Sequence, residues 1–354
     1  MIDAYMYLHS KGDFHLKNIG LDVGNGSIAY AIQSEQEIHT HTYPSTFGVV
    51  DTDVEFLKQQ EQPPLYFVEG TNYALGYEGI RSYRSLPLDA YDRTNRYENS
   101  TFVLFNKLAL LDAATSDGQT GMIECSIVVG TPAEDFKKPL VEHLKSWFQA
   151  PITGTKNNEQ LVLMVKNVEV ISQPIAVLMD AYYDDHGYVT DEDIENEKIL
   201  VIDSGSGTLD LSVFESMAVT KQVSEAIGVN DVYQFILDEI RKREPKMRID
   251  PFELEQQLRS QPGENKTARY GALRMDVTDF YRTGMHQTWE RMKRIIMRHF
   301  PDRKEFDRIL LAGGSGSAFL SQFEKWHPDL FVAQDAQLAI ARGMLKYLLA
   351  RDTQ

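Results

Sequence analysis

Strand-like and helix-like patterns of apolar residues alternate along the first third of the chain. Residues 18–33 read as an apolar strand, a glycine turn and a second strand, and residues 37–43 alternate as a third strand. Apolar residues recur at helical spacing over residues 100–114, and residues 121–130 form an almost continuous apolar run. This part of the chain therefore predicts three strands, a helix and a buried strand.

The middle of the chain continues the alternation. Pro132 is placed to open a helix that reaches about residue 148, because proline is accommodated in a first helical turn. Residues 159–172 predict one long strand or a strand pair, and Pro174 opens a helix to about residue 183. Residues 184–198 are acidic and poor in apolar residues, which indicates a boundary between domains.

The second half begins by repeating the opening pattern of strand, glycine turn and strand over residues 199–214. Helical spacing follows over residues 229–241 and about 268–299, then a short buried strand at 308–312. A helix near residues 335–349 closes the chain. Strands that alternate with helices predict an α/β protein with largely parallel sheets.

The two glycine turns match each other residue by residue. Residues 19–27 (Ile-Gly-Leu-Asp-Val-Gly-Asn-Gly-Ser) and 200–208 (Leu-Val-Ile-Asp-Ser-Gly-Ser-Gly-Thr) both read as an apolar strand followed by Asp-x-Gly-x-Gly-Ser/Thr. Asp22 and Asp203 lie 181 positions apart in a chain of 354 residues. A repeat at half the chain length predicts two similar domains that face each other.

Each turn has the residue types of a phosphate site. Glycine lets the backbone approach a ligand closely, and successive backbone N–H groups form a concave anion site. The hydroxyls of Ser27 and Thr208 can add donors, and an aspartate at each strand end can hold hydrated Mg²⁺. Either turn alone could be a hairpin with glycine at positive φ, but the matched pair favours a phosphate clamp. Neither turn is a P-loop or a dinucleotide-binding fingerprint.

Composition narrows the class of protein. Hydrophobic residues make up 42% of the chain, enough for cores, while the mean hydropathy is −0.35 and no apolar run approaches a membrane span. The net charge of −16 opposes direct nucleic-acid binding. The one cysteine, Cys125, lies in a strand pattern and predicts a buried structural residue in a reducing, cytoplasmic protein.

Four further segments, three between the two turns and one after the second, add to this pattern. They are residues 43–48 (Tyr-Pro-Ser-Thr-Phe-Gly), 66–70 with Ala74, 170–178 (Val-Ile-Ser-Gln-Pro-Ile-Ala-Val-Leu) and 310–316 (Leu-Leu-Ala-Gly-Gly-Ser-Gly). Together the chain resembles the actin, heat-shock chaperone and sugar kinase ATPase superfamily. Length and insertions look most like bacterial actin-like proteins of the plasmid-segregation (ParM-like) group. The resemblance implies an actin-like fold, with two similar domains of mixed, largely parallel sheets around a nucleotide cleft.

The resemblance also implies roles for individual residues. Asp22 and Asp203 would hold Mg²⁺ through water, and Gln173 would position the attacking water of ATP or GTP hydrolysis. The β- and γ-phosphates would be bound by the two turns, through Gly24, Asn25, Gly26, Ser27, Gly205, Ser206, Gly207 and Thr208. The adenosine and α-phosphate would lie along Gly313, Gly314 and Ser315. Glu290 and Lys293 would reach the ribose or base, or else form a surface ion pair.

Two features depart from the family pattern. Many relatives have a lysine shortly after the first glycine loop, whereas this chain reads Ser27-Ile28-Ala29-Tyr30. A phosphate-contacting cation is therefore missing or comes from elsewhere. Residues 1–17 precede the usual start and read as an N-terminal extension.

The domain prediction follows from the same resemblance. Domain I comprises residues 18–198 and 331–354 with a small subdomain inserted at about 48–99, and domain II comprises residues 199–330. The implied function is a nucleotide-driven filament that moves plasmid DNA through a DNA-binding adaptor protein, without direct contact to nucleic acid or membrane. The alternatives are a non-polymerising ATPase and a scaffold that binds nucleotide without turnover.

Overall fold

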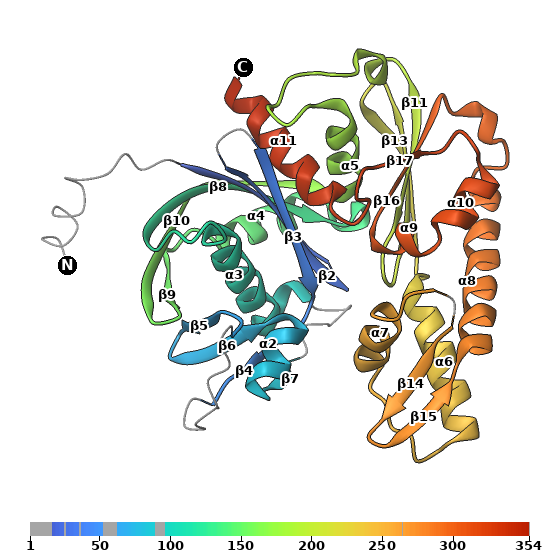
Figure 1. Ribbon diagram of the computed structural model, residues 1–354. Coiled ribbons are helices and arrows are strands. Elements are labelled where there is room, and N and C mark those ends of the chain that lie inside the picture. Colours follow the sequence, from blue (N-terminus) through green and yellow to red (C-terminus); the bar gives the residue numbers. More distant parts are fainter. Residues whose placement is uncertain are drawn as a thin grey trace, which may run out of the picture.

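The protein is built on two sheets that lie side by side in two lobes (Figure 1). The computed structural model describes residues 16–24, 26–34, 37–51, 62–88, 96–263 and 265–353. Asn25 and residues 1–15 of the predicted extension therefore lie outside the described residues. In the described part of the chain, ten strands form the first sheet and five form the second, so the repeat of glycine turns falls on two separate sheets.

The first sheet has the strand order β3-β2-β1-β8-β10-β9-β5-β6-β4-β7. The strands β1, β8 and β10 pair in parallel, and the remaining pairs of this sheet are antiparallel. The prediction of largely parallel sheets is therefore wrong for this sheet, because strands that follow each other in the chain pair as antiparallel hairpins. Its strands are β1 (Lys17–Val23), β2 (Ser27–Ser34), β3 (Glu37–Pro44), β4 (Phe47–Val49), β5 (Leu65–Val68), β6 (Thr71–Leu75), β7 (Leu86–Leu88), β8 (Gly121–Thr131), β9 (Ile152–Lys156) and β10 (Glu159–Ser172).

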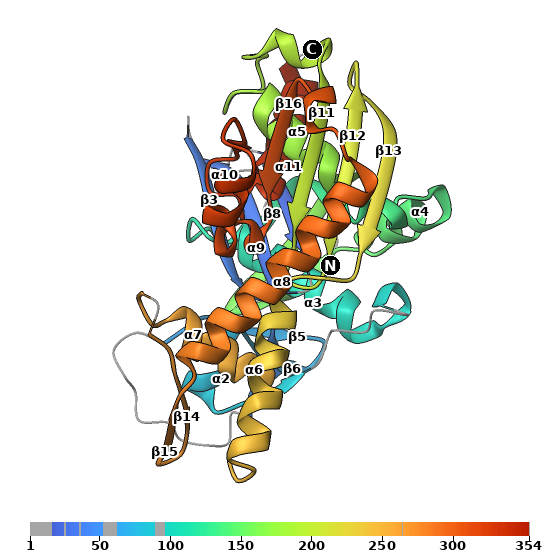
Figure 2. The same cartoon turned by 90° about the vertical axis from the view of Figure 1, so that its right-hand side faces the viewer.

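The second sheet repeats the centre of the first. Its order is β13-β12-β11-β16-β17, with β11, β16 and β17 parallel and β11, β12 and β13 antiparallel. A separate two-stranded hairpin projects from the same lobe (Figure 2). These strands are β11 (Lys198–Ser204), β12 (Leu209–Glu215), β13 (Ala218–Glu225), β16 (Arg308–Ala312) and β17 (Phe331–Val332), with the hairpin strands β14 (Thr267–Tyr270) and β15 (Leu273–Asp276).

Two of the described helices pack between the two sheets. The helices α5 and α11 share one core with residues of both sheets; it includes Met344 of α11, Val128 of β8 and Val201 of β11. The helix α3 joins the core of the first sheet, and α6 and α8 join that of the second. The helices are α2 (Gly76–Tyr83), α3 (Ser100–Ala114), α4 (Lys138–Ser146), α5 (Gln173–Tyr182), α6 (Val229–Arg243), α7 (Pro251–Arg259), α8 (Thr278–His299), α9 (Gly314–Ala318), α10 (Leu320–Trp326) and α11 (Ala339–Thr353).

The central position of α11 depends on two glycines. A Cβ atom at Gly343 would lie 1.8 Å from the carbonyl oxygen of Ala176 in α5. A Cβ atom at Gly20 in β1 would lie 2.2 Å from the carbonyl oxygen of Ala341. Both clashes are with backbone, which cannot move away as a side chain can. The absence of a side chain at these positions therefore lets α11 lie against α5 and β1.

Gly343→Ala is expected to destabilise the protein by about 2 kcal/mol, as overpacking of a filled core does. The matched control is Gly316→Ala, because the added Cβ there would meet only the Leu311 side chain at 3.4 Å. Urea unfolding followed by circular dichroism measures both variants. Equal midpoints for the two variants would contradict the close approach of α11 and α5.

Several elements differ from the sequence prediction. Residues 268–276 belong mainly to the β14–β15 hairpin, and α8 begins only at Thr278, because the alternating segment pairs across a turn at Gly271. Pro132 precedes a 3-10 turn, Ala133–Asp135, and the helix α4 begins at Lys138. The helix α7 was not predicted.

The predicted domain boundary at residue 331 falls inside the second sheet. The strand β17, Phe331–Val332, pairs with β16. The assignment of residues 331–354 to domain I therefore starts two residues early, because tertiary pairing adds an edge strand that sequence periodicity does not mark. We retain the rest of the division into two domains as a proposal. No helix of the described residues is long and apolar enough to cross a membrane.

Candidate functional site

The two glycine loops meet between the sheets. In the first loop, the Gly24 backbone N–H donates to the Ser27 carbonyl oxygen at 3.1 Å, and in the second Gly205 donates to Thr208 at 2.8 Å. A Cβ atom at Gly26 would lie 1.9 Å from the Ser206 Oγ atom. Glycine at position 26 is therefore what allows the first loop to touch the second.

A cavity of about 340 Å³ opens at this junction. Most of the residues predicted to bind phosphate or metal line it. They are Asp22, Gly24, Gly26, Ser27, Gln173, Asp203, Gly205, Ser206, Gly207, Thr208, Gly313 and Gly314. Since these residues come from the ends of β1, β11 and β16 and from the start of α5, both sheets supply walls of the cavity.

Two buried carboxylates face each other at the ends of β1 and β11. Burial raises the pKa of Asp22 to about 6. Two smaller effects lower this pKa: the hydrogen bond from the Gln173 Nε2 atom at 2.7 Å and the positive charge of Arg96. Burial also raises the pKa of Asp203, and the neighbouring charges of Asp210 and Asp22 raise it further. Two such carboxylates favour a bound cation, which would relieve both the desolvation and the repulsion.

The third glycine-rich segment follows β16 and closes one side of the cavity. Gly313 has φ of +88° and donates its N–H to the Ala336 carbonyl oxygen at 2.8 Å. A Cβ atom there would lie 2.4 Å from the Asp203 Oδ1 atom. The left-handed backbone and the contact with Asp203 both require glycine at this position.

Ser315 has a different role from the one predicted. Its side chain is fully buried and does not line the cavity. The Ser315 hydroxyl donates to the Gly205 carbonyl oxygen at 2.6 Å and accepts from the Val229 N–H at 3.2 Å. The serine therefore supports the second glycine loop from behind, because the tight strand-to-helix turn at Gly313 and Gly314 directs it inward.

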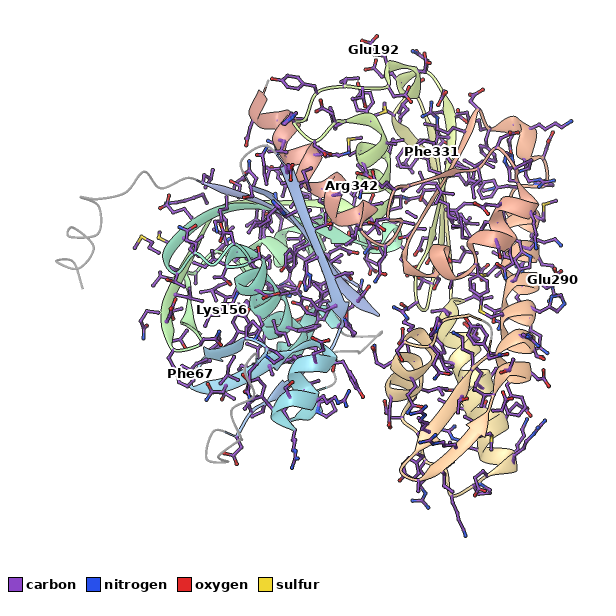
Figure 3. The ribbon with its side chains drawn as sticks, viewed as in Figure 1. Phe67, Lys156, Glu192, Glu290, Phe331 and Arg342 are labelled. Atoms are coloured by element: carbon purple, nitrogen blue, oxygen red, sulfur yellow. The ribbon has the colours of Figure 1, made fainter. Side chains whose placement is uncertain are left out.

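Glu290 and Lys293 lie on α8 and do not line the cavity. Their side chains form an ion pair with each other at 3.3 Å, one turn apart on the helix. In Figure 3, Glu290 lies at the outer edge of the molecule, on the α8 side of the second lobe. The structure therefore matches the alternative of a surface ion pair, and we do not place these residues in the site.

The cavity also contains residues that the sequence did not single out. Arg96, Glu134 and Asp135 line one wall. Gln337 lines another, and its Nε2 atom donates to the Ser27 Oγ atom at 3.2 Å. Arg96, Glu134 and Asp135 lie in short 3-10 turns, and Gln337 lies before α11. None of them belongs to a recognisable motif, so only the fold brings them to the cavity.

Asp210 lies in β12, directly opposite Asp203 in the strand register. It is buried, and burial raises the pKa of its carboxyl group. The short hairpin between β11 and β12 could have revealed this pair, since residues at equal distances from its turn face each other across the two strands.

Comparison with known proteins identifies the fold. The sequence profile described as "Actin like proteins N terminal domain" matches residues 20–175. No curated protein sequence matches the chain. Among solved structures, the apo psk41 ParM protein superposes with a TM-score of 0.72 at 17% identity, covering 96% of this chain and 98% of that one.

Two further structures are similar over almost their whole length. The Alp12 filament structure has a TM-score of 0.63 at 14% identity, covering 95% of this chain and 99% of that chain. The Bacillus thuringiensis ParM structure with ATP has a TM-score of 0.63 at 16% identity, covering 96% and 98%. The chain has an actin-like fold. Its residues 20–175 match the profile of the actin-like N-terminal domain, and its fold is similar to those of bacterial ParM proteins.

Proposed function

We propose that this protein is a filament-forming ATPase that binds Mg²⁺ and ATP in the cavity between its two glycine loops. The observation that carries the proposal is the meeting of the loops, each of which follows a strand with a buried aspartate. Backbone N–H groups of such loops are suited to phosphate oxygens. The similarity to a ParM structure solved with ATP supports the choice of nucleotide, and GTP is the alternative.

The residues of the cavity fit a hydrated magnesium ion. Asp22 and Asp203 are buried and their charges repel, so a divalent cation between them and the phosphates is favoured. Asp22 and Asp203 would hold this ion through water, as hydrated Mg²⁺ prefers carboxylate oxygen. When bound, the ion would neutralise charge on the phosphates.

Gln173 is suited to orient a water molecule. Its Nε2 atom donates to Asp22 at 2.7 Å, which fixes the amide and leaves its carbonyl oxygen as an acceptor for water in the cavity. A neutral amide is too weak a base to remove a proton, so its contribution would be to position the nucleophile. Pro174 in the first turn of α5 anchors this residue at the start of the helix.

Self-association is the part of the proposal that rests on relatives. The Alp12 protein was solved as a filament. A head-to-tail contact that does not close into a ring gives an open polymer, and nucleotide hydrolysis would then weaken the contact. We further propose that the filament moves plasmid DNA in the cytoplasm through an adaptor protein, since the net charge of −16 disfavours direct DNA binding.

Right-angle light scattering with sedimentation tests the proposal. Scattering is expected to rise above a critical protein concentration with ATP and Mg²⁺, and not with ADP and Mg²⁺ or without nucleotide. A parallel sample with GTP decides the base preference. Phosphate release without scattering at any protein concentration would favour the non-polymerising ATPase, and nucleotide binding without either signal would favour the scaffold.

Gln173→Ala is expected to slow phosphate release about 100-fold, because a misplaced nucleophile costs about two orders of magnitude. Polymerisation with ATP should persist and the filaments should disassemble more slowly. Gln234→Ala is the matched control, since Gln234 also donates its amide to an aspartate, Asp238, at 2.9 Å, but on the exposed face of α6. Equal phosphate release by the two variants would remove Gln173 from the mechanism.

A further inference from the structure

The cavity has a cationic residue that does not come from the glycine loops. Among the described residues that line it, Arg96 is the only lysine or arginine. The strand β2, which follows the first loop, begins Ser27-Ile28-Ala29-Tyr30 and offers no cation. The acidic side chains on the cavity wall are Asp22, Asp203, Glu134 and Asp135. A polyphosphate entering this acidic cavity needs a positive partner besides a metal ion, and Arg96 is in place to provide it.

Neighbouring side chains hold Arg96 in a defined position. Its Nη2 atom pairs with the Asp135 Oδ2 atom at 3.0 Å, and the arginine side chain is only 11% exposed. The guanidinium lies 4.6 Å from the centre of the Tyr97 ring, and the Tyr97 hydroxyl donates to the same Asp135 oxygen at 2.8 Å. Arg96 begins the 3-10 turn Arg96–Glu98, directly before the Asn99 cap of α3. The arginine is therefore pre-ordered and loses little side-chain freedom on binding an anion.

Arg96 also shares its cavity with the predicted metal site. It lines the same cavity as Asp22 and Asp203, the two predicted metal ligands. A guanidinium has five N–H donors in a planar fork, so it can hold a carboxylate on one side and a phosphate oxygen on another. The geometry at the cavity wall thus matches the recognition of a phosphate group.

We propose that Arg96 contacts the terminal phosphate of the bound nucleoside triphosphate and takes the place of the cation that β2 lacks. Asp135 and Tyr97 are positioning residues that direct the guanidinium toward the cavity. The inference rests on the proposed function, because it assigns a contact within the same nucleotide site.

Isothermal titration calorimetry with ATP and ADP, each with Mg²⁺, tests the contact. Arg96→Ala is expected to weaken ATP binding about 10- to 100-fold, the value of a charge-assisted hydrogen bond, and ADP binding much less. Arg96→Lys should recover part of the ATP affinity, since it restores the charge but not the planar fork. The ratio of ATP to ADP affinity is the decisive readout, because a purely structural arginine would leave that ratio unchanged.

Arg291→Ala is the matched control. Arg291 forms an ion pair of the same length, 3.0 Å, with Asp231, and it does not line the cavity. This variant should bind both nucleotides like the wild type. Equal weakening of ATP and ADP in Arg96→Ala, or no weakening of either, would overturn the inference. A wild-type protein that binds neither nucleotide would instead overturn the proposed function, so the two failures are distinguishable.

Discussion

Asp203→Asn is expected to abolish measurable nucleotide hydrolysis and at the same time to raise the thermal stability of the nucleotide-free protein. Asp203 is buried, and burial together with the charges of Asp210 and Asp22 raises the pKa of its carboxyl group. An asparagine of nearly equal volume removes that charge. Loss of one precisely placed charge from a catalytic site costs about 100-fold or more in rate.

The raised pKa of Asp203 also predicts how the stability gain of Asp203→Asn depends on pH. A carboxyl group whose pKa is raised on folding binds its proton more tightly in the folded protein. The ordinary pKa of this carboxyl group is 3.8, and its pKa in the folded protein is higher. Without metal and nucleotide, Asp203 therefore destabilises the folded protein progressively as the pH rises from the first pKa to the second. The gain in melting temperature of Asp203→Asn should consequently grow over this range.

Differential scanning calorimetry in EDTA and phosphate-release assays with Mg²⁺ measure the two effects. Asp238→Asn serves as the control, because Asp238 is an exposed residue of α6, remote from the cavity lining, and should change neither quantity. A melting temperature of Asp203→Asn below that of the wild type at pH 7, or hydrolysis at the wild-type rate, would contradict a strained carboxylate at the metal site.

Asp180→Ala is expected to cost about 3–5 kcal/mol of unfolding free energy, the usual loss when one partner of a buried ion pair is removed. Asp180 lies in α5, and its Oδ1 atom accepts from the Arg342 Nε atom of α11 at 2.6 Å. Lys346 of the same helix lies 3.2 Å from that oxygen. The variant would leave two poorly solvated cations at the contact between the helices that separate the sheets (Figure 3).

Urea unfolding measures this loss, and Asp238→Ala provides the reference. Asp238 also pairs with an arginine, Arg241, at 3.2 Å, but both side chains are half exposed and the pair is worth well under about 1 kcal/mol. If the two variants unfold at the same urea concentration, the ion pair between α5 and α11 does not stabilise the fold. A loss confined to Asp180→Ala would show that the ion pair holds α11 against α5.

The sequence predicted correctly those features that a few consecutive residues define. The strand-turn-strand pattern at residues 18–33 corresponds to β1 and β2, and its repeat at 199–214 corresponds to β11 and β12. Cys125 is fully buried in β8, and burial raises the pKa of its thiol to about 12. Such features are readable because a glycine turn and an apolar strand are each defined by a few consecutive residues.

The sequence prediction was wrong where one local pattern is compatible with two different conformations in the folded protein. Residues 268–276 were predicted as the start of a helix but pair within the β14–β15 hairpin. Ser315 follows two glycines of the cavity and yet turns inward to the Gly205 carbonyl oxygen. In both cases the surrounding fold selects the conformation, since side-chain direction depends on what packs against the segment.

By itself, the sequence determined the class of fold and most of the cavity: two aspartates at strand ends, two glycine turns and Gln173. These residues carry their chemistry in short, repeated motifs, and a strand leads each turn to the same edge of its sheet. Only the tertiary structure decided that Arg96, Asp135 and Gln337 complete the cavity and that Glu290 and Lys293 lie outside it. The physical reason is that such contacts join segments far apart in the chain, which packing brings together and no local periodicity encodes.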